Sequence, residues 1–189
     1  MTKKVSLDNK TVLLSYIPIT RSYTEVENGI TKYYIEGKAS NDLVDWYGSK
    51  MSPDLLRKWV EEINGGKKVI IENTHDMEWS ADLGVVVKAW SDFVDNITSF
   101  YIKAELDPDH PLVPFLIKKL NNQDESNKLG LSIFGMCVGD GWHIEYEVFT
   151  NDKGEEVEVG VWVYDDIDLQ RIAVTSFPAN PDTYIDQVS

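Results

Sequence analysis

Short runs rich in β-branched and aromatic residues recur along most of this chain, and they constrain its fold more than any other feature. Such runs are typical of β-strands, and most of them are separated by turn residues rather than by helical segments. Two runs flank the turn 151–154 and predict a β-hairpin. In all, the pattern predicts about seven or eight strands. The runs cover residues 31–38, 67–73, 83–90, 97–106, 129–138, 142–149, 155–164 and 172–177.

Two segments have the helical period instead. In residues 51–66, Ser52 is the predicted N-cap, Pro53 the first helical residue and Gly65 the C-terminal stop. An apolar stripe with spacings of three and four residues follows Pro53 and predicts one buried helix face. Residues 110–123 form the second predicted helix, because Pro114 falls near its first turn, where a missing N–H group is tolerated.

The fold class follows from the way these elements are connected. Strands joined mainly by turns and hairpins, with only two helices, favour an α+β fold that is mainly β. We expect a closed or tightly curved, mostly antiparallel β-barrel surrounded by a few helices. The length of 189 residues fits a single domain over 1–189, with residues 1–30 as an N-terminal extension.

Composition excludes several function classes. The net charge of −14 repels phosphate backbones, so we expect no nucleic-acid partner. No apolar run is long enough to span a bilayer, and the N-terminus lacks a secretory pattern, which together predict a cytosolic protein without a membrane partner. A single cysteine, Cys137, excludes an internal disulfide and a cysteine zinc site. The three histidines lack metal-ligand spacing, so we expect no metal site.

Ser132 places a hydroxyl group in the run 128–137, KLGLSIFGMC, which is apolar after its first residue. In an extended strand, Ser132 and Cys137 point to opposite faces, so they cannot serve the same site. Gly130 and Gly135 remove side chains near Ser132 and leave room for a substrate backbone. The residues alone leave two interpretations open, a hydrogen-bonded core serine or a nucleophile.

The histidines also have two interpretations each. His75 follows a buried-looking strand, at a strand end where functional residues often lie, although a hydrogen-bonded surface histidine is the commoner case. His143 shares the polar face of its strand with Glu145 and Glu147, which favours a solvated surface position. His110 precedes the second helix, where capping or exposure explains it.

An ordered set of motifs carries a family resemblance. A strand ending in YYIEG (33–37) leads to the M-S-P helix, and then to a strand that runs into N-T-H-D and a following L-G-V (83–85). A helix precedes G-L-S-I (130–133), and A-V-T-S-F-P-A-N-P (173–181) closes the set. In this order and at these separations, the chain resembles the prohead (procapsid) maturation proteases of tailed bacteriophages and, more distantly, the herpesvirus assemblins. The resemblance covers residues 31–183.

The resemblance implies roles for particular residues. Ser132 would be the nucleophile and His75 the general base that takes its proton and later gives it to the leaving amine. The loop Pro178-Ala179-Asn180 would supply the oxyanion region, with Ala179 and Asn180 as its candidates. No cofactor is implied.

One position departs from the family pattern. The third catalytic member, a histidine in the assemblins and typically a glutamate in the phage enzymes, falls just before the A-V-T-S run, where this chain has Arg171. An arginine cannot accept a hydrogen bond from a histidine and disfavours an imidazolium nearby. Asp168 is the favoured substitute, with Asp166 and Asp76 as alternatives. The other two outcomes are a weaker Ser/His pair and an inactive protein.

The resemblance thus predicts a serine endopeptidase of phage head maturation, acting in the host cytoplasm inside the procapsid. Its substrates would be the scaffold, segments of the major capsid protein and the protease itself, and a homo-oligomer is left open. The resembled proteases often carry a longer tail, which leaves a truncated or self-processed chain open as an alternative. The alternatives are a catalytically inactive, protease-derived scaffold or assembly protein, and a small binding module, for which the sequence offers no aromatic or charged ligand patch.

Overall fold

The computed structural model describes residues 3–7, 10–14, 25–27, 30–75, 78–122, 128–151, 153–176, 178–180 and 185–188. Its helical elements are α1 (Pro53–Asn64), the 3-10 turn η1 (Trp79–Ala81) and α2 (Val113–Asn121). The strands, in chain order, are β1 (Lys3–Leu7), β2 (Lys10–Leu14), β3 (Glu25–Glu27), β4 (Ile30–Asn41), β5 (Ser49–Met51), β6 (Ile70–Asn73), β7 (Asp82–Val94), β8 (Ile97–Leu106), β9 (Gly130–Cys137), β10 (Trp142–Thr150), β11 (Glu156–Tyr164), β12 (Ile167–Thr175) and β13 (Ile185–Val188).

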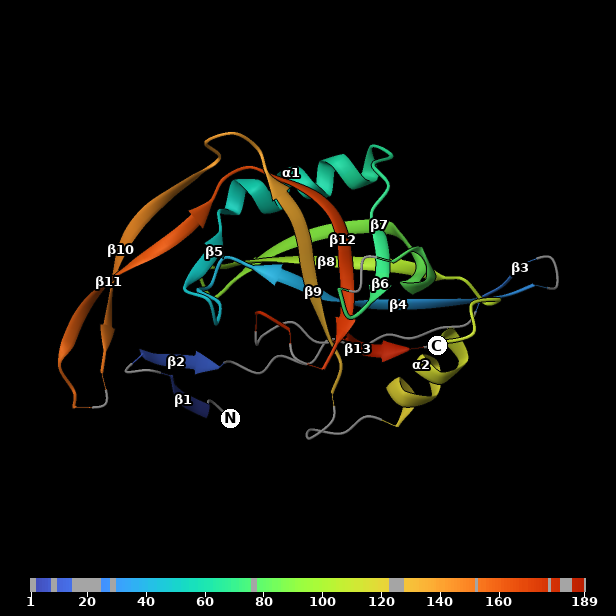
Figure 1. The fold of residues 1–189 in the computed structure, drawn as a ribbon, viewed down its shortest axis with the longest axis horizontal. Helices are drawn as coiled ribbons and strands as arrows, with labels where there is room; N and C mark the ends of the chain where they lie inside the picture. Colours follow the sequence, from blue (N-terminus) through green and yellow to red (C-terminus); the bar gives the residue numbers. More distant parts are fainter. Residues whose placement is uncertain are drawn as a thin grey trace.

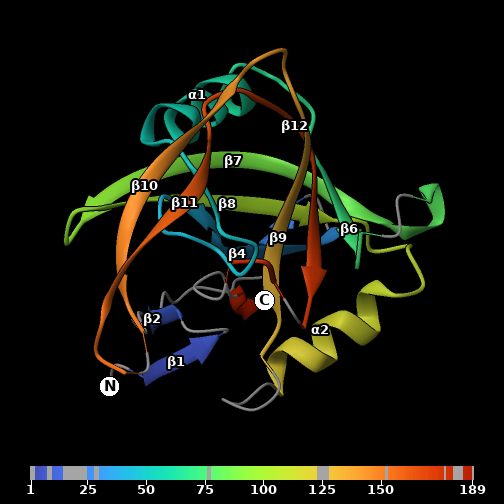
Figure 2. The same cartoon turned by 60° about the vertical axis from the view of Figure 1, so that its left-hand side comes forward.

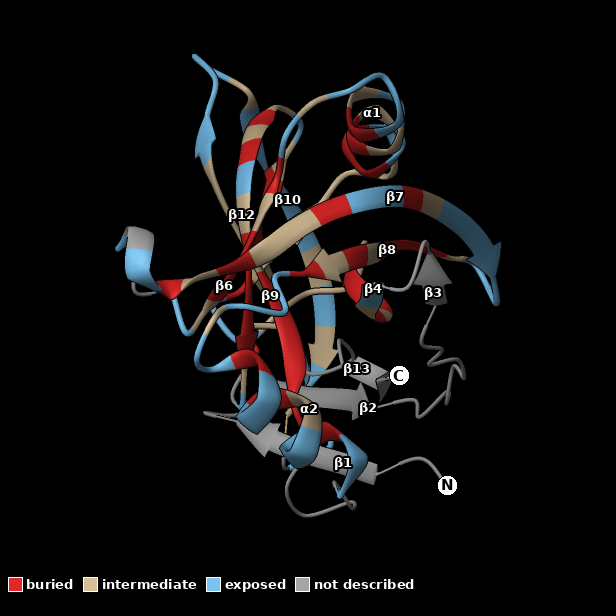
Figure 3. Cartoon of the chain, turned by 90° about the vertical axis from the view of Figure 1, so that its right-hand side faces the viewer, coloured by how far each residue is buried: buried red, intermediate tan, exposed pale blue. Residues whose placement is uncertain are grey.

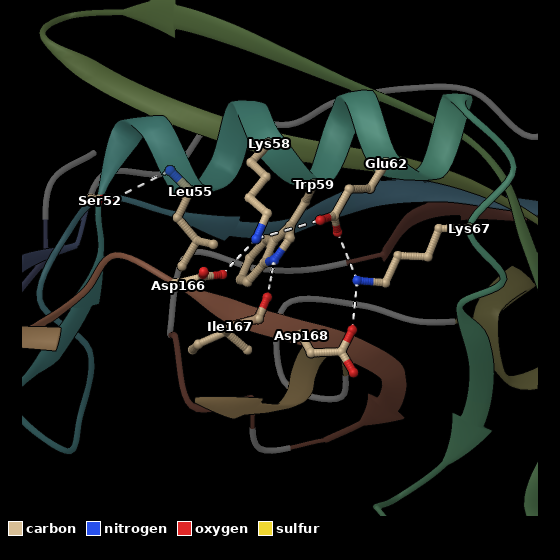
Figure 4. Close-up of polar contacts among 9 residues, drawn as sticks. All are labelled: Ser52, Leu55, Lys58, Trp59, Glu62, Lys67, Asp166, Ile167 and Asp168. Carbon is tan, nitrogen blue, oxygen red and sulfur yellow. Dashed lines mark hydrogen bonds and ion pairs between the residues drawn. The ribbon is translucent and has the colours of Figure 1, made fainter. Parts of the chain in front are cut away.

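Helix α1 has the caps that the sequence predicts. The Ser52 side chain accepts a hydrogen bond from the N–H of Leu55 at 3.3 Å, and Gly65 ends the helix. The buried face includes Trp59, whose indole N–H donates to the carbonyl of Ile167 at 2.9 Å (Figure 4). This contact fixes the helix over the start of β12.

The main sheet has the strand order β13-β4-β8-β7-β6-β12-β9, and β3 adds to β4. Neighbouring strands are antiparallel except β6 and β12, which run parallel. The sheet bends strongly, so that β6, β12 and β9 stand across β4, β8 and β7 (Figures 1 and 2). Buried segments of β9 and β12 are visible in red in Figure 3 and join one core with the inner face of α1.

The predicted β-barrel is wrong, because the sheet stays open. Closure would need β9, at one edge, to pair with β4. The outer edge of β4 is occupied over part of its length, since residues 35–37 pair with β13 and residues 30–32 pair with β3. Among the described residues, no strand ladder joins β4 to β9, and a cleft separates parts of them. The β-rich character of the chain is as expected.

A second sheet has the strand order β10-β11-β5. Its strands β10 and β11 form a long hairpin that projects from the body (Figures 1 and 2). The hairpin is the one predicted around the turn 151–154, where Gly154 has a φ of 80°. Strand β5, which pairs in parallel with β11, was not expected from the sequence.

The segment 164–171 was expected to be a loop before a final strand. In the structure β12 already begins at Ile167, and β13 follows it near the C-terminus. A register shift between Leu169 and Arg171 interrupts the alternation of β12, which explains why the pattern was not recognised as one strand. Within the described part of the chain, no helix has the length and apolar character needed to span a membrane.

Candidate active site

Ser132 lies near the start of β9 and is buried, with 7% of its surface exposed. Its Oγ atom is 2.9 Å from Nε2 of His75, which is hydrogen-bond distance. The two residues are 57 positions apart in sequence. The fold therefore brings together the two side chains that the sequence predicted to act as a pair.

His75 reaches this position because the chain turns sharply after β6. Thr74 and His75 both have positive φ, 57° and 49°, in the left-handed region that non-glycine residues seldom adopt. Each such residue costs about 1–3 kcal/mol, and such strain is concentrated at functional sites. The N–H of Thr74 still bonds to the carbonyl of Val174 at 3.3 Å, so the turn begins directly at the edge of the sheet. The imidazole is partly exposed, and its ring lies 6.3 Å from that of Phe134 between centroids.

Glu72 is the acid that contacts His75. Its Oε1 atom is 3.3 Å from Nδ1 of the imidazole, and its side chain is completely buried. With Nδ1 carrying the proton, His75 donates to Glu72 and accepts from the Ser132 hydroxyl through Nε2. The three side chains thus form a continuous Ser132–His75–Glu72 chain of hydrogen-bond contacts.

The strand register explains how this chain is built. Ser132 on β9 lies opposite Ala173 on β12, and Ala173 in turn pairs with Glu72 on β6. Residues paired in this way point to the same face of a sheet, so the three side chains stand in one row. Because His75 contacts both ends of the row, we expect its imidazole to pass over Ala173. Two strand spacings are about 9.5 Å, a span that an imidazole and its two hydrogen bonds fill only if the middle side chain is small.

Asp168 and Asp166, the acids expected to orient His75, lie elsewhere. Asp168 pairs with Lys67 at 2.8 Å, which holds the pKa of Asp168 below its usual value, and Asp166 pairs with Lys58 (Figure 4). Both acids face α1 and its C-terminal loop rather than the imidazole. Asp76 lies outside the described residues. The acid in contact with His75 is therefore Glu72 and not the predicted Asp168.

Sequence reasoning missed Glu72 because it belongs to an apolar strand run, where a single acid looks incidental. The signal was present in two features: an acid within a buried strand, and a histidine three residues later in a turn. Arg171 was also misjudged. Its guanidinium lies 3.0 Å from Oε2 of Glu72, so it faces the acid rather than the imidazole.

A cleft adjoins Ser132 on the side of β4. It is lined by residues of β4, β5 and β9 and by the loop that contains Ala179 and Asn180. The N–H of Trp46 donates to the carbonyl of Ala179 at 3.2 Å. Because the peptide bond between Ala179 and Asn180 is trans, the N–H of Asn180 points in the direction opposite to the Ala179 carbonyl. The Asn180 side-chain amide donates to Asn41. The predicted oxyanion region therefore borders the same cleft as Ser132, and its role stays a prediction.

The remaining histidines and the cysteine lie apart from this site. His143 contacts Asp165 and Glu145 on the exposed hairpin, and hydrogen bonding to Asp165 raises its pKa. His110 is exposed and bonds to the carbonyl of Ser80 at 2.9 Å. Cys137 is exposed at the end of β9 and, five residues from Ser132 along one strand, lies on the opposite face.

Comparison of the chain with protein-family models gives no match, and comparison with curated proteins gives no significant similarity.

Proposed function

We propose that this protein is a serine endopeptidase with Ser132 as nucleophile, His75 as general base and Glu72 as the orienting acid. One observation carries the proposal: the His75 imidazole lies within reach of the Ser132 hydroxyl at 2.9 Å and of the buried Glu72 carboxylate at 3.3 Å. This is the relation of nucleophile, base and orienting group on which activated serines depend.

The chemistry follows from the geometry. His75 Nε2 takes the proton of Ser132 as Oγ attacks a peptide carbonyl, and the imidazolium then protonates the leaving amine. Glu72 holds the proton on Nδ1, so that Nε2 is free to act as a base, and its charge stabilises the imidazolium. Water then hydrolyses the acyl-enzyme with the same groups in reverse order. Backbone N–H groups around Ala179 and Asn180 are the candidates to hold the oxyanion.

The substrate assignment rests on the ordered motifs that resemble prohead proteases. On that basis the substrates are the scaffold, segments of the major capsid protein and the protease itself, cleaved inside the procapsid in the host cytoplasm. The cleft between β4 and β9 borders Ser132. The protein uses no cofactor in this scheme.

The alternative is a catalytically inactive scaffold or assembly protein derived from a protease. The feature in its favour was Arg171 at the position of the third catalytic member. Because Arg171 contacts Glu72 and not His75, and Glu72 takes the place of the acid, Arg171 no longer counts against catalysis.

Covalent labelling tests the proposal directly. The folded protein is incubated with a fluorophosphonate, digested, and the modified peptide is mapped by mass spectrometry. We expect one adduct, on Ser132, that forms only while the protein is folded. An intact protein that reacts no faster than its urea-unfolded form would support the inactive scaffold instead.

Cys137→Ser provides the matched control at the other end of the same strand. Since Cys137 is exposed and lies on the face opposite Ser132, this variant should be labelled on Ser132 at the wild-type rate. A large loss of labelling would mean that the thiol, rather than Ser132, carries the reactivity.

Ala173→Val tests whether the imidazole passes over Ala173. The two added methyl groups would occupy the space between Ser132 and Glu72 and push the ring out of line, so Ser132 labelling should fall by orders of magnitude. Ala173→Gly is the matched variant, since it clears the same space and should keep most of the rate. Equal rates for Ala173→Val and wild type would show that the ring does not lie there.

A further inference from the structure

The Glu72 carboxylate has a second charged neighbour besides His75. One nitrogen of the Arg171 guanidinium, Nη1, lies 3.0 Å from Glu72 Oε2 and also contacts Asp82 Oδ1. Glu72 belongs to β6, Arg171 to β12 and Asp82 to the start of β7, three adjacent strands of the main sheet. One cation therefore ties together two acids at the end of the row that His75 spans.

Burial shows why Glu72 needs this cation. Its side chain is 0% exposed, whereas those of Arg171 and Asp82 are 21% and 33% exposed. A buried charge is costly unless it is paired and hydrogen-bonded. Arg171 supplies such a pair, because its Nη1 atom lies 3.0 Å from Oε2 of Glu72. Its bond to Asp82, with that to Glu72, raises the pKa of Arg171 despite partial burial, so the guanidinium stays charged.

Geometry also divides the two oxygens of Glu72 between two partners. Oε1 faces Nδ1 of His75 and Oε2 faces Arg171. A carboxylate held through one oxygen presents the other in a fixed direction. Asp82 contacts the same Nη1 atom and so gives the guanidinium a second anchor.

We propose that Arg171, anchored by Asp82, is a positioning residue that pairs with the buried Glu72 carboxylate and keeps it aimed at His75. The inference rests on the proposed function and deepens it. Arg171, which departs from the family pattern, thereby becomes part of the site. In this chain the acid that contacts His75 is Glu72 on β6, and the cation that pairs with it is Arg171 on β12.

A double-mutant cycle with Glu72→Gln tests the proposal through the second-order rate of Ser132 labelling by a fluorophosphonate. Arg171→Met should lower the rate about 10–100-fold, the cost of losing a hydrogen bond to a charged group, and Arg171→Lys should recover part of it. In the Glu72→Gln background, Arg171→Met should cause no further loss, since Arg171 acts through Glu72. Losses that multiply in the double variant would overturn the proposal.

The chain offers a matched control in Lys67. This cation also bridges two carboxylates, those of Glu62 and Asp168, and its side chain is 23% exposed. Lys67→Met removes the same kind of pair at a distance from the site, so it should label at the wild-type rate. An equal loss in Lys67→Met and Arg171→Met would show that any lost ion pair has this effect through stability, which also overturns the proposal.

A second measurement does not depend on reactivity. Nitrogen-15 NMR of His75 reports which ring nitrogen carries the proton in the neutral state. The wild type should hold it on Nδ1, and Arg171→Met should mix the two tautomers, whereas Lys67→Met should not. If the wild type is not labelled, but Arg171→Met mixes the tautomers as expected, the endopeptidase proposal fails while the positioning role stands. An unchanged tautomer in Arg171→Met refutes the positioning role alone.

Arg171→Glu gives a result opposite to the one that family resemblance suggests. The family pattern predicts preserved or raised activity, because the substitution restores the acid of the relatives. In this structure it would place a third carboxylate beside Glu72 and Asp82 and remove their shared cation. We therefore expect Arg171→Glu to lower the rate of Ser132 labelling at least as much as Arg171→Met does. A preserved rate would contradict the positioning role of Arg171.

Discussion

Ser132→Ala should abolish fluorophosphonate labelling, self-cleavage and cleavage of the scaffold. No other group could replace the attacking Oγ, and loss of the nucleophile in a comparable serine enzyme costs about 10⁶-fold in turnover. The thermal midpoint should stay close to that of the wild type. Only one small hydroxyl is lost, and the His75 side chain is exposed enough to bond to water instead.

The control for this variant is the fold itself. Far-ultraviolet circular dichroism and the melting transition of Ser132→Ala are compared with those of Cys137→Ser, which changes the other end of β9. If the folded Ser132→Ala protein still cleaves its scaffold, the nucleophile is another residue, and the contact between Ser132 and His75 serves only the structure.

Glu72→Gln should lower the rate of cleavage by about 10⁴-fold, the loss seen when an orienting carboxylate is replaced by an amide in a related mechanism. The amide keeps the size of the side chain but removes the charge that supports the imidazolium, and it lets the imidazole adopt the wrong tautomer. The variant should still fold, because Arg171 keeps its bond to Asp82.

Asp168→Asn is the paired comparison. Asp168 is about half exposed, and its ion pair with Lys67 is of a kind that contributes at most about 1 kcal/mol to stability. This variant should cleave at the wild-type rate. If Asp168→Asn cleaves slowly and Glu72→Gln cleaves fast, Asp168 is the orienting acid, as the sequence favoured. If both variants cleave at the wild-type rate, Ser132 and His75 act as a pair without a third member.

The local pattern of the sequence was sufficient for several elements. Capping residues and the apolar period placed α1 to within a residue or two, and alternation placed Ser132 and Cys137 on opposite faces of β9. The turn at 151–154 placed the β10–β11 hairpin. Each of these features depends on neighbours only a few residues away, and that is the range over which helical and strand periods act.

The closure of the sheet could not be inferred in this way. Whether β9 meets β4 depends on whether β13, near the other end of the chain, has already occupied that edge. Strand order is a competition between distant segments, and strands of similar composition give no local sign of their partner. The register shift in β12 also interrupts the alternation of its side chains, so the first half of the strand lacks the two-residue period by which strands are recognised in a sequence.

The candidate site shows the same division. The sequence by itself determined that a hydroxyl stands in a run with the pattern of a buried strand, and that a histidine follows another strand. Only the tertiary structure decided that Glu72 faces His75 and that Arg171 faces Glu72. The reason is that parallel pairing of β6 with β12 sets Glu72 beside Ala173 and Ser132, across chain separations of about 100 and 60 residues. A two-residue period fixes which face a side chain points to, but the register between distant strands fixes what it meets there.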